Sequence, residues 1–408
     1  MPYTHCMSVS ICDVITSKPF QRLKGKTQLY SPFSNDHYRN RLTHSLEVFS
    51  IANQIADNFK GVDIDHELLG VIALCHDIGH TPYGHEGERT LNEILSGKDN
   101  LGGLLPDILK KNNLAQGFKH NIYSSKLFLR TFPYDPNNGK DYKIVDGIMK
   151  HTKPFYKDKA GNVIKLDYGI KNIVYVFPEL NNISNYEACL SPISIEGKIV
   201  NIADEIAQRC SDFTDSMISK LLLFNDFKEH ISDYIDSNDE AFSYKNAEKY
   251  IREKLINGVI FSADNILFDE YTKGLNDRIE QIITDKIQSS YLIRSDDSKN
   301  CYMIRQVFKA YYQKPSQLDD STVANIYSDL IYQNVRQVKK FVTGNRLDII
   351  GICDFIKKAC SNVRDNIASK YDVIVFKVAM LNIAYYIANM TDSFLQKKFM
   401  KLYNGGIE

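Results

Sequence analysis

The fold of this chain is indicated most clearly by residues 68–88, which read LLGVIALCHDIGHTPYGHEGE. The first eight residues are mostly apolar and predict a helix with an inward face. His76 and Asp77 follow directly, and Gly79 and Pro82 then end the helical pattern. A carboxylate beside such an apolar run is costly to bury unless a cation or hydrogen bonds compensate its charge. The stretch therefore predicts a polar pair at the end of a core helix.

Two further helices are predicted to carry polar groups on an inward face. His44 shares a helix face with the apolar residues at positions 48, 51 and 55, which are three and four residues apart. Asp204 lies inside the apolar run IVNIADEIA, residues 199–207, of a helix expected from about 194 to 223. Two imidazoles and two carboxylates on separate helices suit Mn²⁺ or Fe²⁺, or Mg²⁺ with more bound water. The sequence therefore predicts a site for one divalent metal ion. Its expected ligands are His44, His76, Asp77 and Asp204.

Each of these residues also has a more ordinary interpretation. A single histidine on an apolar face is more often a hydrogen-bonded core residue, and a single aspartate in a helix is more often a cap or a surface partner. The adjacent pair His76-Asp77, followed by Gly79 and Pro82, is harder to explain in this way. We therefore favour the metal interpretation for the whole set. His151 could neighbour the site, although a capping or surface role suits its position equally well.

Helical periodicity dominates the chain and predicts an all-α fold. The exception lies at about 155–192, where the stretch KAGN at 159–162 stands between polar and β-branched runs and indicates a hairpin or an irregular insertion. We expect a helical core at 1–223 that contains this insertion, and a helical C-terminal region at 224–408 packed on the core. The last two helices are expected near 346–370 and 371–402.

Composition argues against several classes of protein. The 408 residues include 50 Lys and Arg and 50 Asp and Glu, so no overall positive charge indicates a nucleic-acid-binding protein. The eight cysteines form no C-x-x-C pair and are expected to be reduced, mostly buried thiols. The first twenty residues do not resemble a signal peptide, and no run of about 18 apolar residues occurs. We therefore predict a cytoplasmic protein without a membrane span.

Four ordered segments carry a resemblance to a known family. They are FQRLKGKTQL at 20–29, RLTHSLEV at 41–48, HDIGHTPYGH at 76–85 and FKHN at 118–121. Together with Asp204 they resemble the HD superfamily of metal-dependent phosphohydrolases and, more closely, the dGTPase-like deoxynucleoside triphosphate triphosphohydrolases. The metazoan SAM-and-HD-domain dNTPases share the same skeleton. The resemblance covers about residues 17–215.

The resemblance implies an HD-domain helical core at 1–223 as the catalytic part of the chain. It also implies hydrolysis of dGTP, or of dNTPs generally, to a deoxynucleoside and tripolyphosphate. By resemblance, the metal ligands are again His44, His76, Asp77 and Asp204. The implied catalytic residues are His85, Glu88 and His120. The implied substrate contacts are Arg41 and His80 at the triphosphate, and Gln28, Leu29 and Asp212 at the deoxyribose.

These residue types suit the implied reaction. A metal ion can lower the pKa of bound water and polarise a phosphoryl oxygen, and Arg41 can engage two phosphate oxygens with its planar guanidinium group. The leaving 5′-oxygen needs a proton, which an imidazole that titrates near neutral pH can donate. Glu88 follows His85 by three residues and would lie on the same side of a helix. A carboxylate bonded to His120 would raise the pKa of this imidazole and orient it.

The sequence departs from the family pattern at three positions. Gln208 stands where many relatives have a tyrosine against the sugar, and Glu205 stands where the metazoan relatives have a phosphate-binding lysine. Val14 replaces an arginine that is usual in the bacterial enzymes. These differences concern sugar discrimination and base preference and leave the expected metal ligands in place.

Two alternatives stay open. The chain could be an HD phosphohydrolase for another nucleotide, such as a monophosphate, a cyclic nucleotide or an alarmone. It could also be a catalytically inactive HD protein that senses nucleotides or binds nucleic acid. The first class need not carry the segments at 22–28 and 118–121, and the second would be expected to lose metal ligands or catalytic histidines, which are all present in this chain. The resemblance further implies a homo-oligomer; a nucleotide activator is left open, and binding of nucleic acid is not indicated.

Overall fold

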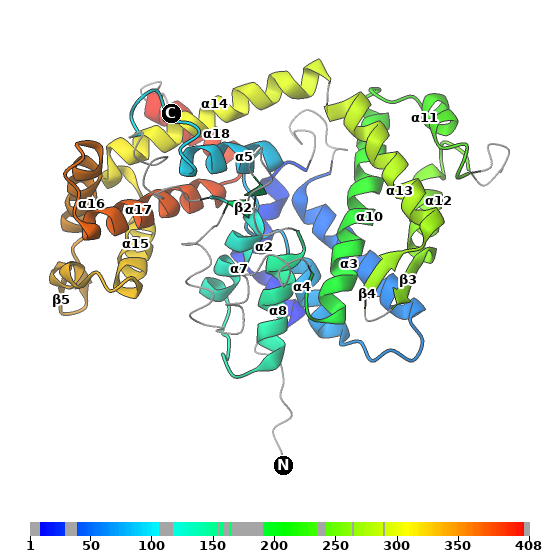
Figure 1. Cartoon of the computed structure of the whole chain (residues 1–408), viewed down its shortest axis with the longest axis horizontal. Coiled ribbons are helices and arrows are strands. Elements are labelled where there is room, and N and C mark those ends of the chain that lie inside the picture. The colour runs from blue at the N-terminus through cyan, green and yellow to red at the C-terminus, as the bar shows by residue number, and fades with distance from the viewer. Residues whose placement is uncertain are drawn as a thin grey trace, which may run out of the picture. The chain divides into compact units, whose positions relative to one another are not determined.

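Helices dominate the structure, a computed structural model of the whole chain (Figure 1). It describes residues 9–28, 39–105, 117–152, 156–157, 163–164, 191–235, 242–262, 265–288 and 290–403. The strands in this part of the chain are short and form separate two-stranded hairpins. The all-α prediction is therefore confirmed.

The chain divides into two compact units, and each draws on three segments. The first unit comprises Met1–Gly79, Leu127–Pro154 and Asn185–Ser298. The second comprises His80–Lys126, Phe155–Ser184 and Lys299–Glu408. We expected a core that ends near residue 223. The two units follow a different division of the chain, and the expected boundary stays a prediction.

Four helices form the centre of the first unit. α10 (Ile195–Ile218) packs against α3 (Arg41–Asn58), α4 (His66–Cys75) and α8 (Gly139–Lys150), and α4 also packs against α3 and α8 (Figure 1). The remaining elements of this unit are α1 (Ile11–Thr16), α2 (Lys18–Arg22), the 3₁₀ helix η1 (Leu23–Gly25), α11 (Phe224–His230), α12 (Ala247–Asn257), β3 (Val259–Ser262), β4 (Asn265–Phe268), α13 (Glu270–Ile283) and the π-helical η4 (Thr284–Gln288). Two helices, α7 (His120–Thr131) and α14 (Tyr291–Gln313), contain residues of both units.

Side-chain caps determine where the central helices begin. The Asn40 side chain accepts a hydrogen bond from the backbone N–H of Thr43 at the start of α3. Asp65 accepts one from Leu68 at the start of α4, and Ser194 accepts one from Gly197 at the start of α10. Such caps satisfy backbone donors that have no partner within the helix. In this way the sequence itself sets the first turn of each helix.

Two glycines let α8 and α10 approach closely. A Cβ atom on Gly197 would lie 2.6 Å from Cβ of Pro192 and 3.3 Å from Cα of Gly147. A Cβ atom on Gly147 would lie 2.9 Å from Cδ1 of Ile72, a residue of α4. There is no room for a methyl group at either position, because contacts this short force neighbouring atoms to move.

The substitution Gly197→Ala should therefore destabilise the protein. We expect the free energy of unfolding to fall by about 1–3 kcal/mol, the usual cost of overpacking, despite the better helix propensity of alanine. Urea unfolding followed by circular dichroism measures this change. The matched control is Gly139→Ala at the start of α8, where an added Cβ meets no atom within 4 Å. Equal stability of the two variants would contradict close packing at Gly147 and Gly197.

The second unit centres on α17 (Lys370–Ala388), which packs against α5 (Gly84–Leu95), α15 (Asp320–Tyr332) and α16 (Ile349–Arg364). A buried polar network ties α15 to α17: Asp329 accepts a hydrogen bond from Asn382 at 2.8 Å and pairs with the Lys126 ammonium at 2.8 Å. The remaining elements wholly within this unit are β1 (Tyr156–Lys157), β2 (Val163–Ile164), the 3₁₀ helices η5 (Pro315–Gln317) and η6 (Arg336–Phe341), β5 (Val342–Thr343), β6 (Arg346–Leu347) and α18 (Asp392–Tyr403).

In the part of the chain that the structure describes, one helix, α17, is long and apolar enough by length and composition to cross a membrane. Its most apolar stretch is 67% buried inside the structure, as is usual for the core helix of a compact unit. The helix expected near 371–402 is in fact two helices, α17 and α18. Thr391 precedes α18 and caps it, because its Oγ1 accepts a hydrogen bond from the N–H of Phe394 at 3.3 Å. The helix expected near 346–370 is the shorter α16.

The predicted hairpin within 155–192 is confirmed where the structure describes this segment. Tyr156 pairs with Ile164 and Lys157 with Val163 in antiparallel register, on either side of the predicted turn at 159–162. Apart from residues 191–192, the rest of the insertion lies outside the described residues. The hairpins β3–β4 and β5–β6 were not predicted. Short runs such as VIFS and NILF suit a helix and a strand equally well, so periodicity does not distinguish the two.

Candidate metal centre and histidine cluster

The first unit brings the four predicted metal ligands together. His44 lies in the first turn of α3, His76 and Asp77 directly follow α4, and Asp204 lies near the middle of α10. His44, His76 and Asp77 are almost fully buried, and the Asp204 side chain is 19% exposed. Since these three helices pack against one another, the side chains converge from separate directions.

The distances between these groups are those of atoms that could share one ion. One ligand atom from each of His44, His76 and Asp77 lies within 4.8 Å of the other two. Asp204 Oδ1 lies 2.9 Å from His44 Nε2 and 3.7 Å from His76 Nε2. His76 Nε2 also lies 3.8 Å from Asp77 Oδ2. We call this set, His44, His76, Asp77 and Asp204, the metal cluster.

The hydrogen bond made by the His76 ring leaves one of its nitrogens suited to bind a cation. Its Nδ1 lies 2.7 Å from the carbonyl oxygen of Ala73, and because a carbonyl can only accept, Nδ1 must donate. In the neutral ring Nε2 then carries a lone pair. This Nε2 is buried and has no hydrogen-bond partner among the described residues. A buried acceptor that faces two carboxylates without a donor is costly, and a divalent ion between these groups would satisfy all three, so the residues present fit a metal.

Electrostatics keep the Asp204 carboxylate ionised. Burial by itself would raise the pKa of Asp204, but the hydrogen bond from His44 and the nearby imidazoles of His76, His44 and His151 outweigh burial and hold the pKa below its ordinary range. Burial likewise favours the neutral form of His44, yet its hydrogen bond to Asp204 raises the pKa of His44. An ionised carboxylate is the form that binds a metal.

Arg41 contacts the metal cluster, and Gln28 follows Thr27, a backbone partner of Arg41, in the chain. The Arg41 guanidinium donates to the Asp77 carboxylate and, through Nε, to the carbonyl oxygen of Thr27 at 3.2 Å. Thr27 also pairs with Asn40 in an isolated β-bridge, which holds Gln28 near the start of α3. Within the described part of the chain, buried Arg41 Nη2 and Gln28 Oε1 have no hydrogen-bond partner. Leu29, predicted next to them, lies outside the described residues.

Asp212 lies two helical turns after Asp204 on α10 and is buried. Burial raises the pKa of Asp212, Arg209 opposes this effect, and the neighbouring carboxylate of Asp215 adds to it, so that the pKa rises to about 7. At neutral pH a large share of this carboxyl group is protonated. It can then donate a hydrogen bond to a hydroxyl oxygen as well as accept one.

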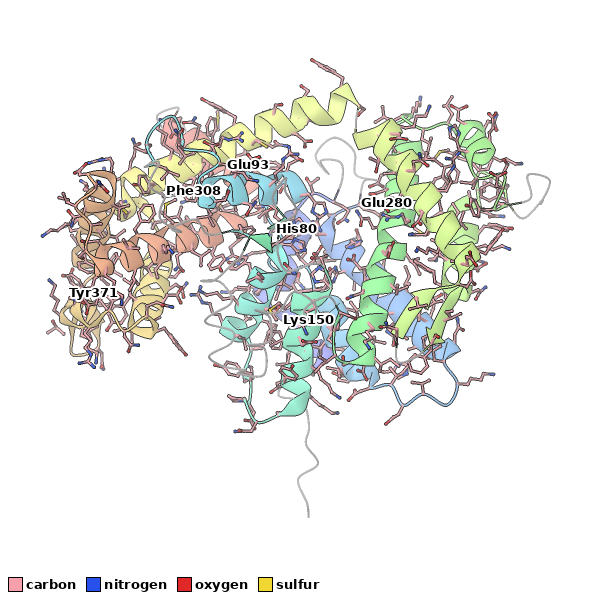
Figure 2. The ribbon with its side chains drawn as sticks, viewed as in Figure 1. His80, Glu93, Lys150, Glu280, Phe308 and Tyr371 are labelled. Atoms are coloured by element: carbon pink, nitrogen blue, oxygen red, sulfur yellow. The ribbon has the colours of Figure 1, made fainter. Side chains whose placement is uncertain are left out.

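His151 also lies beside the metal cluster, a placement that the sequence had left open. It follows Lys150, labelled in Figure 2, at the end of α8. Its Nδ1 donates to the carbonyl oxygen of Ile148 at 2.7 Å, the same three-residue contact that His76 makes after α4. Its Nε2 lies 4.0 Å from Asp77 Oδ1, and its ring centre lies 5.0 Å from that of His76. The signal in the sequence was this shared position directly after a helix whose last residues are buried.

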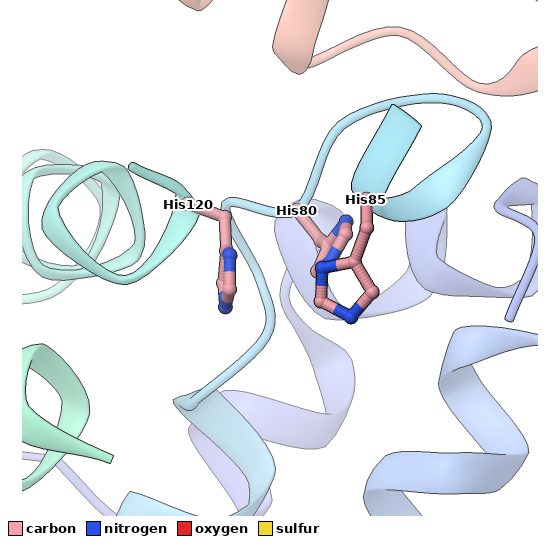
Figure 3. Close-up of side chains that lie close together, drawn as sticks. All are labelled: His80, His85 and His120. Atoms are coloured by element: carbon pink, nitrogen blue, oxygen red, sulfur yellow. The ribbon is translucent and has the colours of Figure 1, made fainter. Parts of the chain in front are cut away.

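The second unit contains a group of three histidines, His80, His85 and His120, which we call the histidine cluster (Figure 3). The rings of His80 and His120 stack with their centres 4.4 Å apart, and the His85 ring lies 5.2 Å from His80 and 6.1 Å from His120. One ring nitrogen of each lies within 4.8 Å of the others. His80 and His120 are buried, whereas His85 is exposed and can meet a ligand from solvent.

Glu88 orients the histidine cluster. Its carboxylate accepts a hydrogen bond from His120 Nδ1 and another from the His120 backbone N–H at 3.1 Å, and it pairs with the Lys119 ammonium at 3.1 Å. Burial alone would raise the pKa of Glu88, but the charges of His120, Lys119 and His85 outweigh it and hold the pKa well below its ordinary range. The ionised carboxylate thus fixes the proton on Nδ1 of His120 and leaves Nε2 for a ligand or a proton transfer.

Comparison with known proteins finds one matching family model and several similar proteins. Residues 41–209 match the HD domain. The "Deoxyguanosinetriphosphate triphosphohydrolase-like protein" of Rickettsia akari (strain Hartford) is 27% identical over 398 residues, which cover 89% of this chain and 93% of the relative. The protein of the same name from Rickettsia typhi (strain ATCC VR-144 / Wilmington) is 28% identical over 364 residues, which cover 81% and 86%.

Among solved structures, the chain is similar to a hypothetical protein from Aquifex aeolicus, at 13% identity and a TM-score of 0.32, over 87% of this chain and 71% of that one. This likeness is too weak to support a comparison of folds.

Replacement of His76 tests the metal cluster. We expect His76→Ala to weaken Mn²⁺ binding by at least about tenfold, because a ligand is lost and two carboxylates are left facing each other. Metal analysis of the purified protein and titration with Mn²⁺ measure this loss. The matched control is His66→Ala, which removes an exposed imidazole of the same unit whose Nδ1 lies 3.0 Å from the side-chain oxygen of Asn53. Equal Mn²⁺ affinity in both variants would contradict the assignment.

Proposed function

We propose that this chain, which contains an HD domain over residues 41–209, is a metal-dependent phosphohydrolase that cleaves deoxynucleoside triphosphates to a deoxynucleoside and tripolyphosphate. The observation that carries the proposal is the buried set of two imidazoles and two carboxylates around the unpartnered Nε2 of His76. The names of the Rickettsia relatives support the substrate class.

The metal cluster is proposed to hold one divalent ion, Mn²⁺, Fe²⁺ or Mg²⁺, through His44, His76, Asp77 and Asp204. Such an ion supplies an activated water and polarises a phosphoryl oxygen. The chain contributes the positions of its ligands: Ala73 orients the His76 ring, and Arg41 orients the Asp77 carboxylate. With Nδ1 engaged by Ala73, the lone pair of His76 Nε2 faces the carboxylates of Asp77 and Asp204.

Arg41 is proposed to bind the triphosphate. Its Nη1 and Nε are already occupied by Asp77 and Thr27, whereas buried Nη2 lacks a partner in the described part of the chain. A phosphate oxygen would satisfy this donor with a charge-assisted hydrogen bond. The guanidinium group would also compensate negative charge that develops on the phosphoryl oxygens during attack.

The histidine cluster is proposed to supply the proton for the leaving 5′-oxygen. His120 suits this role, because the Glu88 carboxylate bonded to its Nδ1 orients the ring and leaves Nε2 as the atom that exchanges a proton. His85 is the exposed member and the second candidate for the acid. His80, stacked on His120, is proposed to contact a phosphate.

The deoxyribose is proposed to bind between Gln28 and Asp212. Gln28 Oε1 is a buried acceptor without a partner among the described residues, and it suits a 3′-hydroxyl donor. The carboxyl group of Asp212, with its pKa near 7, can accept from or donate to the same hydroxyl. Leu29 is proposed to pack nearby. The proposed homo-oligomer, the cytoplasmic location and a nucleotide activator stay predictions.

Product analysis tests the proposed reaction. Each of the four dNTPs and the four NTPs is incubated with the protein in Mn²⁺ or Mg²⁺, and the products are separated by ion-exchange chromatography. We expect a deoxynucleoside and tripolyphosphate in equal amounts. Release of pyrophosphate or orthophosphate would instead assign the chain to another nucleotide phosphohydrolase, and no turnover of any nucleotide would favour a nucleotide-sensing protein.

The substitution His120→Gln separates proton transfer from metal binding. We expect kcat to fall by roughly 10²–10⁴-fold, the usual contribution of a positioned acid or base, while the Mn²⁺ content of the protein stays at the wild-type level. Steady-state kinetics and metal analysis of the same preparation measure both. If the variant lost its metal instead, His120 would belong with the ligands and the division of roles would be wrong.

A further inference from the structure

The segment between His80 and His85 follows an unusual backbone path. Tyr83 has a φ of 59° and a ψ of 31°, and Gly84 follows with a φ of 62°. This left-handed region suits glycine but is rare for a bulky residue, because the Cβ atom crowds the backbone. A residue keeps such a conformation only where its surroundings hold it there. The conformation of Tyr83 therefore needs a cause in the contacts of this segment.

The backbone of Tyr83 decides how the members of the histidine cluster face one another. Tyr83 directly precedes α5, and this helix carries His85 and Glu88, the carboxylate that orients His120. His80 lies three residues before Tyr83, at the other end of the segment (Figure 3). A change in the backbone angles of Tyr83 would therefore rotate His80 relative to His85.

Two local contacts stabilise the segment in part. Thr81 Oγ1 donates a hydrogen bond to the carbonyl oxygen of Gly84 at 2.7 Å. Gly87 of α5 packs directly on the segment, because a Cβ atom there would overlap the carbonyl oxygen of Pro82. These contacts hold the residues on either side of Tyr83 and leave its own conformation to be explained.

A distant residue contacts Tyr83 directly. Oδ1 of Asp392 accepts a hydrogen bond from the Tyr83 backbone N–H at 3.0 Å, and the Tyr83 hydroxyl donates to the carbonyl oxygen of Asp392 at 3.2 Å. Asp392 is the first residue of α18 and is 1% exposed. Both residues belong to the second unit. Two hydrogen bonds thus join the same pair of residues across 309 positions of the chain.

Asp392 is itself held in place by the packing of α18. Thr391 caps the helix, and Leu395, about one turn after Asp392, is fully buried. At the other end of the helix, the Tyr403 hydroxyl donates to the carbonyl oxygen of Gln306 in α14 at 2.9 Å. The helix is therefore fixed at both ends, and Asp392 can act as a rigid support for the backbone of Tyr83.

We propose that Asp392 is a positioning residue for the histidine cluster: its side chain holds Tyr83 in the left-handed conformation that sets the places of His80 and His85. The inference rests on the proposed function, because it assumes that these histidines take part in the reaction. It gives α18 a role in the site, although this helix lies outside the residues that match the HD domain. Its specific consequence is that kcat depends on Asp392 through the backbone of residue 83.

A double-mutant cycle in the full-length protein tests this consequence. Kinetics are measured with the dNTP that the wild-type protein cleaves fastest. We expect Asp392→Ala to lower kcat by roughly 10–10²-fold, since a displacement of about 1 Å can cost up to about 10²-fold, while the Mn²⁺ content stays at the wild-type level. In a Tyr83→Asn background the same substitution should cost much less, because asparagine adopts the left-handed conformation more readily than tyrosine.

A conservative variant and a matched control complete the cycle. Asp392→Asn keeps an oxygen for the Tyr83 N–H and should retain most of the wild-type kcat. The control Asp354→Ala removes an exposed carboxylate from α16 in the same unit and should leave kcat unchanged. Equal losses from Asp392→Ala with tyrosine and with asparagine at position 83 would overturn the inference, and so would a loss of the same size in Asp392→Asn.

Hydrogen–deuterium exchange separates the inference from the proposed function, because it requires no turnover. Asp392→Ala should speed exchange in peptides that span residues 80–88 by at least about tenfold, since the segment loses its distant support, and should leave exchange in α10 unchanged. If wild-type protein cleaves a dNTP but exchange in this segment does not depend on Asp392, only the inference fails. If wild-type protein cleaves no dNTP but the exchange does depend on it, the proposed function fails and Asp392 remains the support of the segment.

Discussion

The structure of the first unit depends on the compensation of two carboxylates that are held among apolar helices. Asp77 and Asp204 face the imidazoles of His76 and His44, and the carboxylate of Asp77 also accepts from Arg41. These contacts do not satisfy every group, since buried Nε2 of His76 lacks a hydrogen-bond partner in the described part of the chain. A charge arrangement of this kind is stable in a helical core only when a cation or strong donors complete it. The packing of α3, α4 and α10 is thus coupled to the chemistry of their polar side chains.

The second unit uses the same principle with a different result. Glu88 is buried, and its charge is balanced by His120 and Lys119 rather than by an open ligand position. The carboxylate therefore fixes the tautomer of one imidazole, while the stacked ring of His80 and the exposed ring of His85 complete the histidine cluster. One group of residues is suited to hold a cation and the other to hold and move a proton. The two tasks are those that hydrolysis of a phosphate ester requires.

α10 organises the proposed site along its length. Asp204, near its middle, belongs to the metal cluster, and Asp212, two turns later, is the proposed sugar contact. The close approach of α8 at Gly147 and Gly197 brings His151 and Lys150 to the same region. Because a helix is rigid, the spacing of these side chains sets the distance between the parts of a ligand that it can bind.

The sequence by itself determined the helices and the polar residues on their inward faces, because periodicity and caps are local properties of the chain. His44, His76, Asp77 and Asp204 could be selected in this way, and the structure places them together. Periodicity says which face of a helix is inward but not which neighbour that face meets. Only the tertiary structure therefore decided that His151 joins His76, that Lys150 and Lys198 line one cavity, and that the run VIFS is a strand instead of a helix. These outcomes depend on packing between segments far apart in the chain, which no local pattern encodes.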